Sequence, residues 1–329
     1  MTRAMVLAAG VGSRLEPISS FIPKPLVPVL NTPVIVNILH GLKIHGITEV
    51  VSNTHYLAEN LREYFRTHPQ ELQPTFIHEE ELSGDAGGVR HCREFLDQDT
   101  FLVIMGDLIT NADISRIIKA HKNKGAIATI GVKKVSDVSR FGVMKRDAKG
   151  FIQAFQEKPK PEEAISNEIS TGIYVLEPEI FEHIPREGVY GFGRQLFPTL
   201  VDKGLPVLGE EIEGHWSDVG TLHDLFWSNM DALSGKVRLF TQPEKCRQTF
   251  PDVRISPDSL IGANTTIGRG SVIGDDCIIG NNCIIAENVV LDHCLVFPNC
   301  TLPAGMRLRD SIYAFDQLIS VAPKAGLAT

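Results

Sequence analysis

The chain has 329 residues, of which 43% are hydrophobic and 22% charged, with 28 glycines and 19 prolines. These values exclude a disordered, collagen-like or coiled-coil protein and leave room for about two domains of ~150 residues each. A formal net charge of −8 argues against a nucleic-acid partner, which would need a basic surface. No apolar stretch approaches the ~20 residues of a membrane span and no signal-peptide pattern is visible, so we expect a cytoplasmic protein without a membrane partner.

Residues 1–235 alternate short apolar runs with helical stretches. The expected strands are Ala4–Ala9, Glu49–Ser52, Thr75–His78, Phe101–Met105 and Ala126–Val132. The expected helices are Val34–Lys43, Ala58–Phe65, Val89–Leu96 and Ile114–Lys122. This alternation is typical of βαβ crossovers and predicts an α/β domain with a Rossmann-like, mostly parallel sheet and helices on both faces. Between Gly142 and Val175 three strands follow without helices, which predicts an inserted β lobe.

The first strand ends in a glycine-rich loop, Leu7-Ala8-Ala9-Gly10-Val11-Gly12-Ser13-Arg14-Leu15. In open α/β sheets ligands bind at the carboxyl ends of the strands, so this loop is a candidate binding site. It is not a dinucleotide fingerprint, because Leu15 stands where the third glycine would be, and it is not a P-loop, because no G-K-[ST] follows. Its backbone N–H groups, with Arg14 and with Lys24 between two prolines, can still wrap a triphosphate.

The last third of the chain has a six-residue repeat. The recurring aliphatic or aromatic residues are Ile255, Ile261, Ile267, Ile273, Ile279, Ile285, Leu291 and Phe297. A mostly small residue precedes them by two positions at Ser259, Thr265, Ser271, Cys277, Cys283 and Val289. The pattern resembles the left-handed parallel β-helix family, in which both residues point inward. We expect two to three coils within residues 255–329, which include a tail, and a linker over residues 236–254.

Four of the six cysteines follow this repeat. Cys277 and Cys283 take the small inward position, whereas Cys294 and Cys300 take an outward one. Because residues 18 apart should stack in such a helix, we expect no cysteine pair to line up. Ordinary packing is therefore favoured over a zinc site or a disulfide.

The segment from Leu7 to Pro28 resembles the signature of the sugar-phosphate nucleotidylyltransferases (NDP-sugar pyrophosphorylases), in particular those of the mannose-1-phosphate guanylyltransferase type. Further motifs of that family follow in order as GDAGG (84–88), GD (106–107), FGV (141–143), EKP (157–159), TGIY (171–174) and WSDVGT (216–221). A C-terminal left-handed β-helix is also familiar in the family. The resemblance implies transfer of a nucleotidyl group from an NTP to a sugar 1-phosphate, giving an NDP-sugar and pyrophosphate without a covalent enzyme intermediate.

The resemblance also implies roles for individual residues. Nucleotide binding falls to Leu7, Ala8, Ala9, Gly10, Gly12, Ser13, Arg14, Lys24, Asp85 and Gly87. Sugar-phosphate binding falls to Gly142, Glu157, Lys158, Thr171 and Gly172. The catalytic residues are Arg14, Lys24, Asp107 and Asp218, of which the two carboxylates hold Mg²⁺. Without the resemblance, these carboxylates would be read as caps or turns, Glu157 and Lys158 as a surface pair, and the glycines as turns.

Asp85 stands where related enzymes commonly have threonine. A carboxylate can accept two hydrogen bonds from the N1–H and N2–H₂ edge of guanine, whereas uracil and thymine offer only N3–H. This favours GTP. A helix cap is the equally weighted alternative for Asp85.

The leading substrate pair is therefore GTP with mannose 1-phosphate, and the alternative is UTP or dTTP with glucose 1-phosphate. A catalytically silent paralogue that binds an NDP-sugar and regulates a partner is the competing class. It would be expected to lack one of five residues, all of which are present: Arg14, Lys24, Asp107, Lys158 and Asp218.

An acyltransferase acting through the β-helix is disfavoured because no catalytic histidine is evident in a protruding loop. We expect the β-helix to mediate homo-oligomer assembly or a regulatory contact.

Overall fold

The protein divides into two compact units in a computed structural model, which describes residues 2–243, 246 and 248–322. The first unit contains Met1–Val11, Leu39–Leu108 and Ala112–Trp216, and the second contains Gly12–Ile38, Ile109–Asn111 and Ser217–Thr329. Within the expected linker, residues 244, 245 and 247 lie outside the described residues, as does the end of the tail, 323–329. The domain boundaries expected at 235 and 254 stay a prediction.

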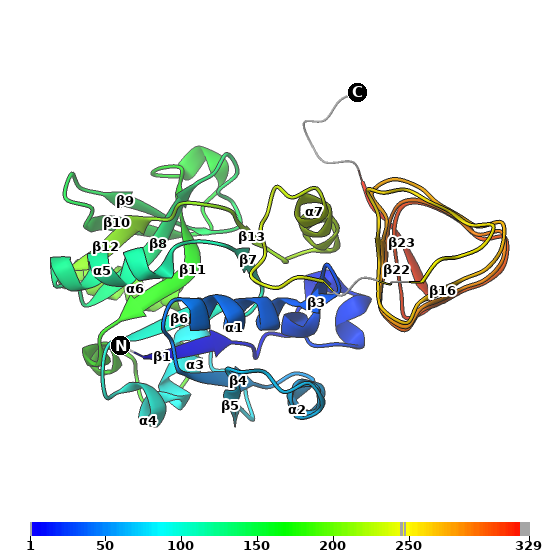
Figure 1. The fold of residues 1–329 in the computed structure, drawn as a ribbon. Coiled ribbons are helices and arrows are strands. Elements are labelled where there is room, and N and C mark those ends of the chain that lie inside the picture. Colours follow the sequence, from blue (N-terminus) through cyan, green and yellow to red (C-terminus); the bar gives the residue numbers. More distant parts are fainter. Residues whose placement is uncertain (1, 244–245, 247, 323–329) are drawn as a thin grey trace. The chain divides into compact units, whose positions relative to one another are not determined.

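A nine-stranded sheet forms the first unit (Figure 1). Its strands are β1 (Arg3–Leu7), β4 (Glu49–Thr54), β5 (Pro74–His78), β6 (Phe101–Met105), β8 (Ala128–Lys134), β9 (Gly142–Arg146), β10 (Ile152–Glu157), β11 (Glu168–Leu176) and β12 (Val207–Glu211). The order is β10-β9-β11-β6-β1-β4-β5, and β8 pairs with both β11 and β12. Strand β1 is parallel to β4 and β6, β4 is parallel to β5, and β12 is parallel to β8. The α/β fold class predicted from the sequence is confirmed.

Helices cover both faces of this sheet, which is why its central strands are apolar throughout. The helices of the unit are α2 (Ala58–Thr67), α3 (Asp85–His91), α4 (Arg93–Leu96), α5 (Ile114–Lys124) and α6 (Phe197–Asp202). On β8, Ile130 joins the hydrophobic core with Phe197 of α6, whereas the adjacent Thr129 contacts His121 of α5. Since neighbouring strand residues point to opposite faces, α5 and α6 pack on opposite faces of the sheet.

Two expectations from the sequence differ in detail from the structure. The helix expected over Val89–Leu96 is two short helices, α3 and α4, separated at Cys92. The three strands expected as an inserted lobe are β9, β10 and β11, and they extend the main sheet because β11 pairs antiparallel with both β6 and β8. The β-rich stretch is therefore one side of the sheet.

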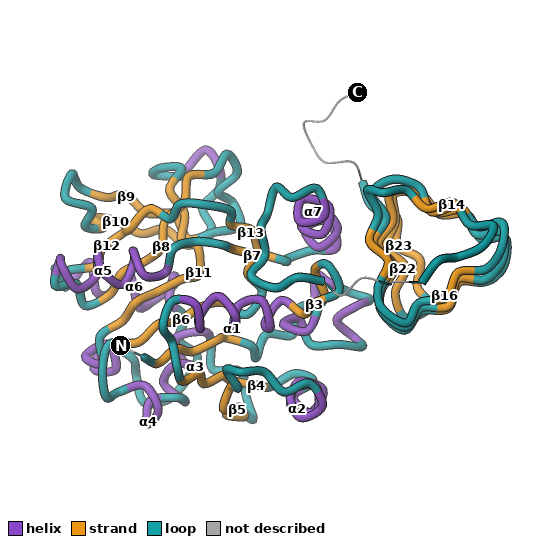
Figure 2. The backbone as a smooth tube through the Cα atoms, in the orientation of Figure 1, coloured by secondary structure: helices purple, strands orange, loops and turns teal. Residues whose placement is uncertain are grey.

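A parallel β-helix makes up much of the second unit, with a triangular cross-section (Figure 1). Its strands are β14 (Arg254–Ile255), β15 (Leu260–Ile261), β16 (Thr266–Ile267), β17 (Val272–Ile273), β18 (Ile278–Ile279), β19 (Ile284–Ile285), β20 (Val290–Val296), β21 (Thr301–Leu302), β22 (Arg307–Ala314) and β23 (Gln317–Ser320). Strands of successive coils lie over one another on the sides of the triangle, and loops form its corners (Figure 2). The left-handed β-helix expected from the repeat is confirmed.

Inward packing and corner geometry both follow the six-residue repeat. Ile273, Ile279 and Leu291 are at most 1% exposed, as expected for the inward position. Asn264 and Asn282 have positive φ at equivalent corners, a conformation that asparagine tolerates better than most residues. The Asn264 amide donates to Oδ1 of Asn282 at 3.2 Å, so the corners are also linked from coil to coil.

The register changes after Leu291, and this overturns the expectation for the cysteines. Ile279 pairs with Val296 and not with Phe297, so one residue is missing from the corner where His293 has a φ of 52°. The neighbouring pairs Ile278–Leu295 and Ile284–Thr301 then bring Cys277 level with Cys294 and Cys283 level with Cys300. Cys294 is 1% and Cys300 6% exposed, so both point inward, and the prediction of outward, unaligned cysteines was wrong. All six remain free thiols.

The second unit also contains elements outside the β-helix. They include β2 (Pro28–Val29), β3 (Thr32–Pro33) and α7 (Leu222–Leu233). Strands β7 (Leu108–Thr110) and β13 (Trp216–Asp218) pair with each other. Each of these strands contains a boundary between the two units, and so does helix α1 (Val34–Ile44). In the described part of the chain, no helix has the length and apolarity that crossing a membrane requires.

Substitution of Gly262 tests the coil spacing. A Cβ atom at Gly262 would lie 2.5 Å from the backbone nitrogen of Asn281 in the next coil, so Gly262→Ala should lower the free energy of unfolding by about 1–3 kcal/mol. Ala286 occupies the same repeat position, and Ala286→Gly should cost only about 0.5–1 kcal/mol. Chemical denaturation of both variants measures the difference. Equal stability of Gly262→Ala and the unsubstituted chain would contradict the packing argument.

Candidate functional site

The predicted phosphate-binding loop is divided between the two units. Leu7 ends β1 and is followed in the first unit by Ala8 and Ala9, which are buried, and by Gly10, which is exposed. The Ala8 backbone N–H donates to Oδ1 of Asn53 at 2.9 Å, which fixes the start of the loop at the carboxyl edge of the sheet.

A buried hydrogen-bond network anchors this edge and was missed by the sequence reasoning. Asn53 lies near the carboxyl end of β4, and its amide donates to Oε1 of Glu79 at 2.6 Å. Glu79 follows β5, is only 2% exposed, and accepts from the backbone N–H of Ser83 at 3.2 Å and from its hydroxyl. The loop after β1, the ends of β4 and β5 and the start of α3 are therefore held together. The sequence signal that could have indicated this network is the presence of polar residues, Asn53 and Glu79, at the ends of expected strands.

Asp85 is the first residue of α3 and joins this helix to the distant loop that ends where the helical turn Phe192–Leu196 begins. Its Oδ1 accepts from the backbone N–H of Ala86 at 2.8 Å and of Phe192 at 2.6 Å. Burial raises the pKa of this carboxyl above its ordinary value, and the negative charge of Glu157 adds to the rise, against the lowering by the two backbone bonds. Gly87 donates to the Tyr190 carbonyl at 2.9 Å, a second link to that loop.

Several of the predicted sugar-phosphate residues come together on β9 and β10. Gly142 begins β9 and pairs with Glu157 at the end of β10, and a Cβ at Gly142 would lie 3.2 Å from Oε2 of Glu157. Gly193 also leaves room for this carboxylate, because a Cβ there would overlap it. Glu157 is thus seated between two glycines, with its side chain 23% exposed.

Lys158 has an unusual backbone for a residue with a side chain. Its φ is 49°, in the left-handed region, and its N–H donates to the Phe141 carbonyl at 3.0 Å. Its Nζ lies 3.5 Å from Oε1 of Glu157, and the Lys158 side chain is 54% exposed. Left-handed backbone at a lysine is uncommon and concentrates at functional sites.

Thr171 and Gly172 lie on β11, the strand next to β9 in the sheet. Thr171 is 1% exposed, and its hydroxyl donates to the Gly131 carbonyl at 2.7 Å. Its own carbonyl accepts from the Trp216 indole at 2.8 Å. Gly172 has a φ of 75°, and a Cβ there would lie 2.6 Å from Cγ of Met105. Both therefore hold backbone in place, and the Thr171 hydroxyl is already engaged.

Four of the predicted nucleotide-binding residues belong to the second unit: Gly12, Ser13, Arg14 and Lys24. Gly12 has a φ of 71° and begins a 3₁₀ turn that leaves Ser13 and Arg14 exposed. A Cβ at Gly12 would lie 3.4 Å from Cβ of Lys24, so the structure brings these parts of the segment together. Lys24 lies between Pro23 and Pro25 and is the first residue of another 3₁₀ turn.

The two predicted metal ligands lie next to paired strands. Asp107 directly precedes β7, Asp218 ends β13, and β7 pairs with β13. Among the described residues there is no cluster of three or more histidine, cysteine or acidic side chains that would bind a metal by itself. Two carboxylates fit Mg²⁺, which takes one or two from a protein and the rest of its ligands from phosphates and water.

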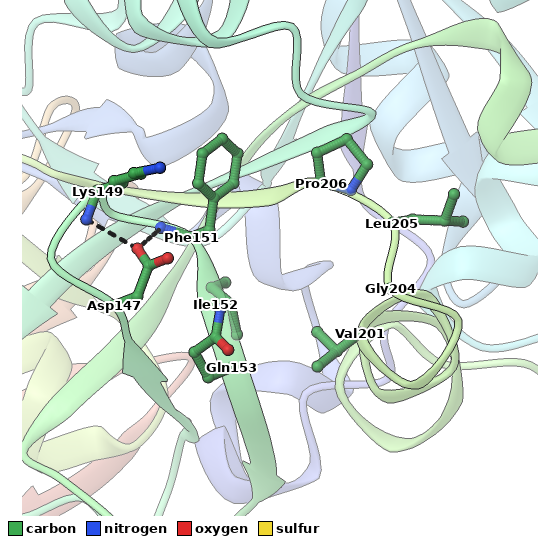
Figure 3. Close-up of a pocket in the computed structure, with 9 residues that line it drawn as sticks. All are labelled: Asp147, Lys149, Phe151, Ile152, Gln153, Val201, Gly204, Leu205 and Pro206. Carbon is green, nitrogen blue, oxygen red and sulfur yellow. Dashed lines mark hydrogen bonds between the residues drawn. The ribbon is translucent and has the colours of Figure 1, made fainter.

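A cavity of about 390 Å³ lies elsewhere in the first unit, between the β9–β10 turn and the end of α6 (Figure 3). It is lined by Asp147, Lys149, Phe151, Ile152, Gln153, Val201, Gly204, Leu205 and Pro206. None of these is a predicted site residue. Asp147 is engaged by the backbone N–H groups of Lys149 and Phe151, each at 2.9 Å, so its carboxylate stabilises the turn.

Glu79 provides a test of the buried network. Glu79→Ala removes the acceptor for Asn53 and Ser83 and should lower the free energy of unfolding by about 1–3 kcal/mol, because their donors stay buried without a partner. Glu80→Ala is the matched control, since Glu80 is the adjacent, exposed carboxylate. Thermal or chemical denaturation compares the two. Equal effects of both substitutions would show that the network does not stabilise the edge of the sheet.

Two protein families match parts of this chain. The nucleotidyl transferase family matches residues 3–235, and the bacterial transferase hexapeptide family (six repeats) matches residues 258–293. A UTP–glucose-1-phosphate uridylyltransferase of Synechocystis is 40% identical over 250 residues, which cover 72% of this chain and 64% of the relative. The catalytic subunit beta of the Xenopus tropicalis mannose-1-phosphate guanylyltransferase is 30% identical over 227 residues, covering 68% and 62%. The chain thus spans somewhat less than two thirds of these relatives.

The fold also matches a solved structure of UDP-glucose pyrophosphorylase complexed with UDP-glucose, with a TM-score of 0.63. The match covers 72% of this chain and 99% of the other at 19% sequence identity, so it concerns the fold. With a family match that extends over most of its length, the chain belongs to the nucleotidyl transferase family.

Proposed function

We propose that the protein transfers a nucleotidyl group from an NTP to a sugar 1-phosphate, giving an NDP-sugar and pyrophosphate. The observation that carries this proposal is the family match over residues 3–235, within which the whole glycine-rich loop with Arg14 and Lys24 is present. The two relatives described above, a uridylyltransferase and a guanylyltransferase of sugar 1-phosphates, support the same reaction class.

The proposed reaction needs positioning and charge neutralisation and no protein nucleophile. Backbone N–H groups of the glycine-rich loop cradle the triphosphate, while Arg14 and Lys24 neutralise it and the departing pyrophosphate. Lys158 holds the sugar phosphate so that its oxygen attacks the α-phosphorus in line. Glu157 accepts hydrogen bonds from sugar hydroxyls, and its seat between Gly142 and Gly193 supports this role.

Asp107 and Asp218 are the proposed Mg²⁺ ligands. Their support is the pairing of β7 with β13 and the preference of Mg²⁺ for one or two carboxylates together with phosphate oxygens. When bound, the ion neutralises negative charge on the phosphates.

Two substrate pairs have specific support. The carboxylate at position 85 favours GTP, with mannose 1-phosphate as the sugar, as in the 30% identical relatives. The 40% identical uridylyltransferase favours UTP with glucose 1-phosphate, as does the use of Asp85 Oδ1 by two backbone N–H groups. A cytoplasmic location and self-association through the hexapeptide repeats complete the proposal.

The deciding experiment measures pyrophosphate release across GTP, UTP, dTTP, ATP and CTP, each combined with mannose, glucose and galactose 1-phosphate. Turnover with one or a few pairs supports the proposal. Binding of an NDP-sugar without turnover for any pair would instead identify a regulatory protein.

Removal of either proposed metal ligand should nearly abolish turnover. Asp107→Asn or Asp218→Asn takes one negative charge from the metal site, and we expect pyrophosphate release at saturating Mg²⁺ to fall about a hundredfold or more. Asp202→Asn is the control, because Asp202 is an exposed carboxylate at the end of α6. A near-normal rate in either variant would remove that residue from the metal site.

The role of Asp85 in base selection is tested by Asp85→Thr. If the carboxylate accepts from the guanine edge, GTP use should fall more than UTP use, measured as the ratio of the two kcat/KM values. Equal losses with both nucleotides would show that Asp85 acts only by joining α3 to the loop at Phe192.

A further inference from the structure

The segment 12–38 belongs to the same compact unit as the β-helix. It carries the two cations proposed to neutralise the triphosphate, Arg14 and Lys24, yet it has little regular structure of its own. Before α1 it contains three 3₁₀ turns of three residues each and the two-residue strands β2 and β3. Such short turns make few hydrogen bonds, so the conformation of this segment depends on what it packs against.

One support is an aromatic stack onto the last turn of the β-helix. Phe21, which lies between Arg14 and Lys24 in the sequence, stacks on Phe315 with ring centroids 4.5 Å apart and planes 9° apart. Phe315 occupies the turn between β22 and β23 and in turn packs edge-on against Phe297, at 6.0 Å. The aromatic contacts thus continue from the segment into the coils.

A second support lies at the β2–β3 turn. The Asn31 side-chain amide donates to the Ile279 carbonyl of β18 at 3.0 Å. Asn229 of α7 holds the same turn from another direction, because it accepts from the Leu30 N–H at 2.9 Å and donates to the Pro28 carbonyl at 3.2 Å. The turn is therefore bonded to both a coil and α7.

Burial on the β-helix agrees with these contacts. Four outward residues on one side of the prism are only 0–2% exposed: Leu260, Ile278, Leu295 and Ile312. By contrast Ile284, outward on a neighbouring side, is 55% exposed. His293 at the shortened corner packs against Phe226 and Trp227 of α7, with centroids 4.9 and 5.4 Å apart. One side of the prism is thus a packing surface within the unit.

We infer that the β-helix is a scaffold for the segment that carries Arg14 and Lys24, with Phe315 and Asn31 as its positioning residues. For its kinetic consequence this inference rests on the proposed function. Neither residue belongs to the proposed substrate-binding set. Each acts by holding backbone on one side or the other of Lys24, so its loss should weaken NTP binding more than sugar-phosphate binding.

Hydrogen exchange measured by mass spectrometry on the full chain tests the scaffold directly. In Phe315→Ala we expect amides of residues 12–31 to exchange at least about threefold faster, with residues 255–302 unchanged, and Phe315→Tyr to restore the original rates. Leu318→Ala is the control, because Leu318 lies three residues further on in β23 and is 54% exposed. Unchanged exchange of residues 12–31 in Phe315→Ala would overturn the inference.

Asn31→Gly is the second variant, in case Phe315→Ala opens the coils. It removes the bond to Ile279 and suits the φ of 64° at this position. Faster exchange confined to residues 12–31 supports the inference, and unchanged exchange contradicts it.

Kinetics supply the functional readout. We expect both Phe315→Ala and Asn31→Gly to raise the KM for the NTP about threefold or more, with the KM for the sugar 1-phosphate unchanged. Equal rises in both KM values would contradict a role specific to this segment. If the unsubstituted chain turns over no substrate pair, the proposed function fails, whereas the exchange experiment still decides whether the β-helix holds residues 12–31.

Discussion

Parallel pairing of β1 with β4 and β6 is the constraint on which the first unit depends. It brings the carboxyl ends of these strands to one edge, where Leu7 pairs with both Asn53 and Met105. A buried carboxylate, Glu79, then bonds to Asn53 and Ser83 and fixes the start of α3 against that edge. The parts of this unit that carry proposed nucleotide contacts, residues 7–10 and the start of α3, are positioned by this edge.

Stacking of coils is the corresponding constraint in the second unit. Each coil repeats after 18 residues, except where the corner at His293 loses one residue and the repeat becomes 17. The change keeps aliphatic residues inside, because Val296 takes the place that strict counting assigns to Phe297. Outward aliphatic residues on one side of the prism are buried, and the segment with Arg14 and Lys24 belongs to the same compact unit.

The site residues illustrate two kinds of outcome. Gly142, Glu157 and Lys158 were predicted from motifs, and the structure shows their local geometry: paired strand ends, a carboxylate seated between glycines, and left-handed backbone at Lys158. Glu79 and Phe192 carried no recognisable motif. Their contacts, to Asn53 and Asp85, join residues 26 and 107 positions apart, and such pairings depend on the sheet order and on loop paths that local patterns do not encode.

The amino-acid sequence by itself determined the α/β class, the β-helix and the family, because periodicity and local motifs report the faces of strands and the ends of loops. The sequence could not determine the coil register beyond Leu291, because counting six-residue repeats does not detect one residue missing from a corner. It also could not show that Asp85 bonds to the loop at Phe192, or that Phe21 stacks on Phe315. Those facts depend on which distant segments pack together, and packing is decided by shape and burial across the whole chain.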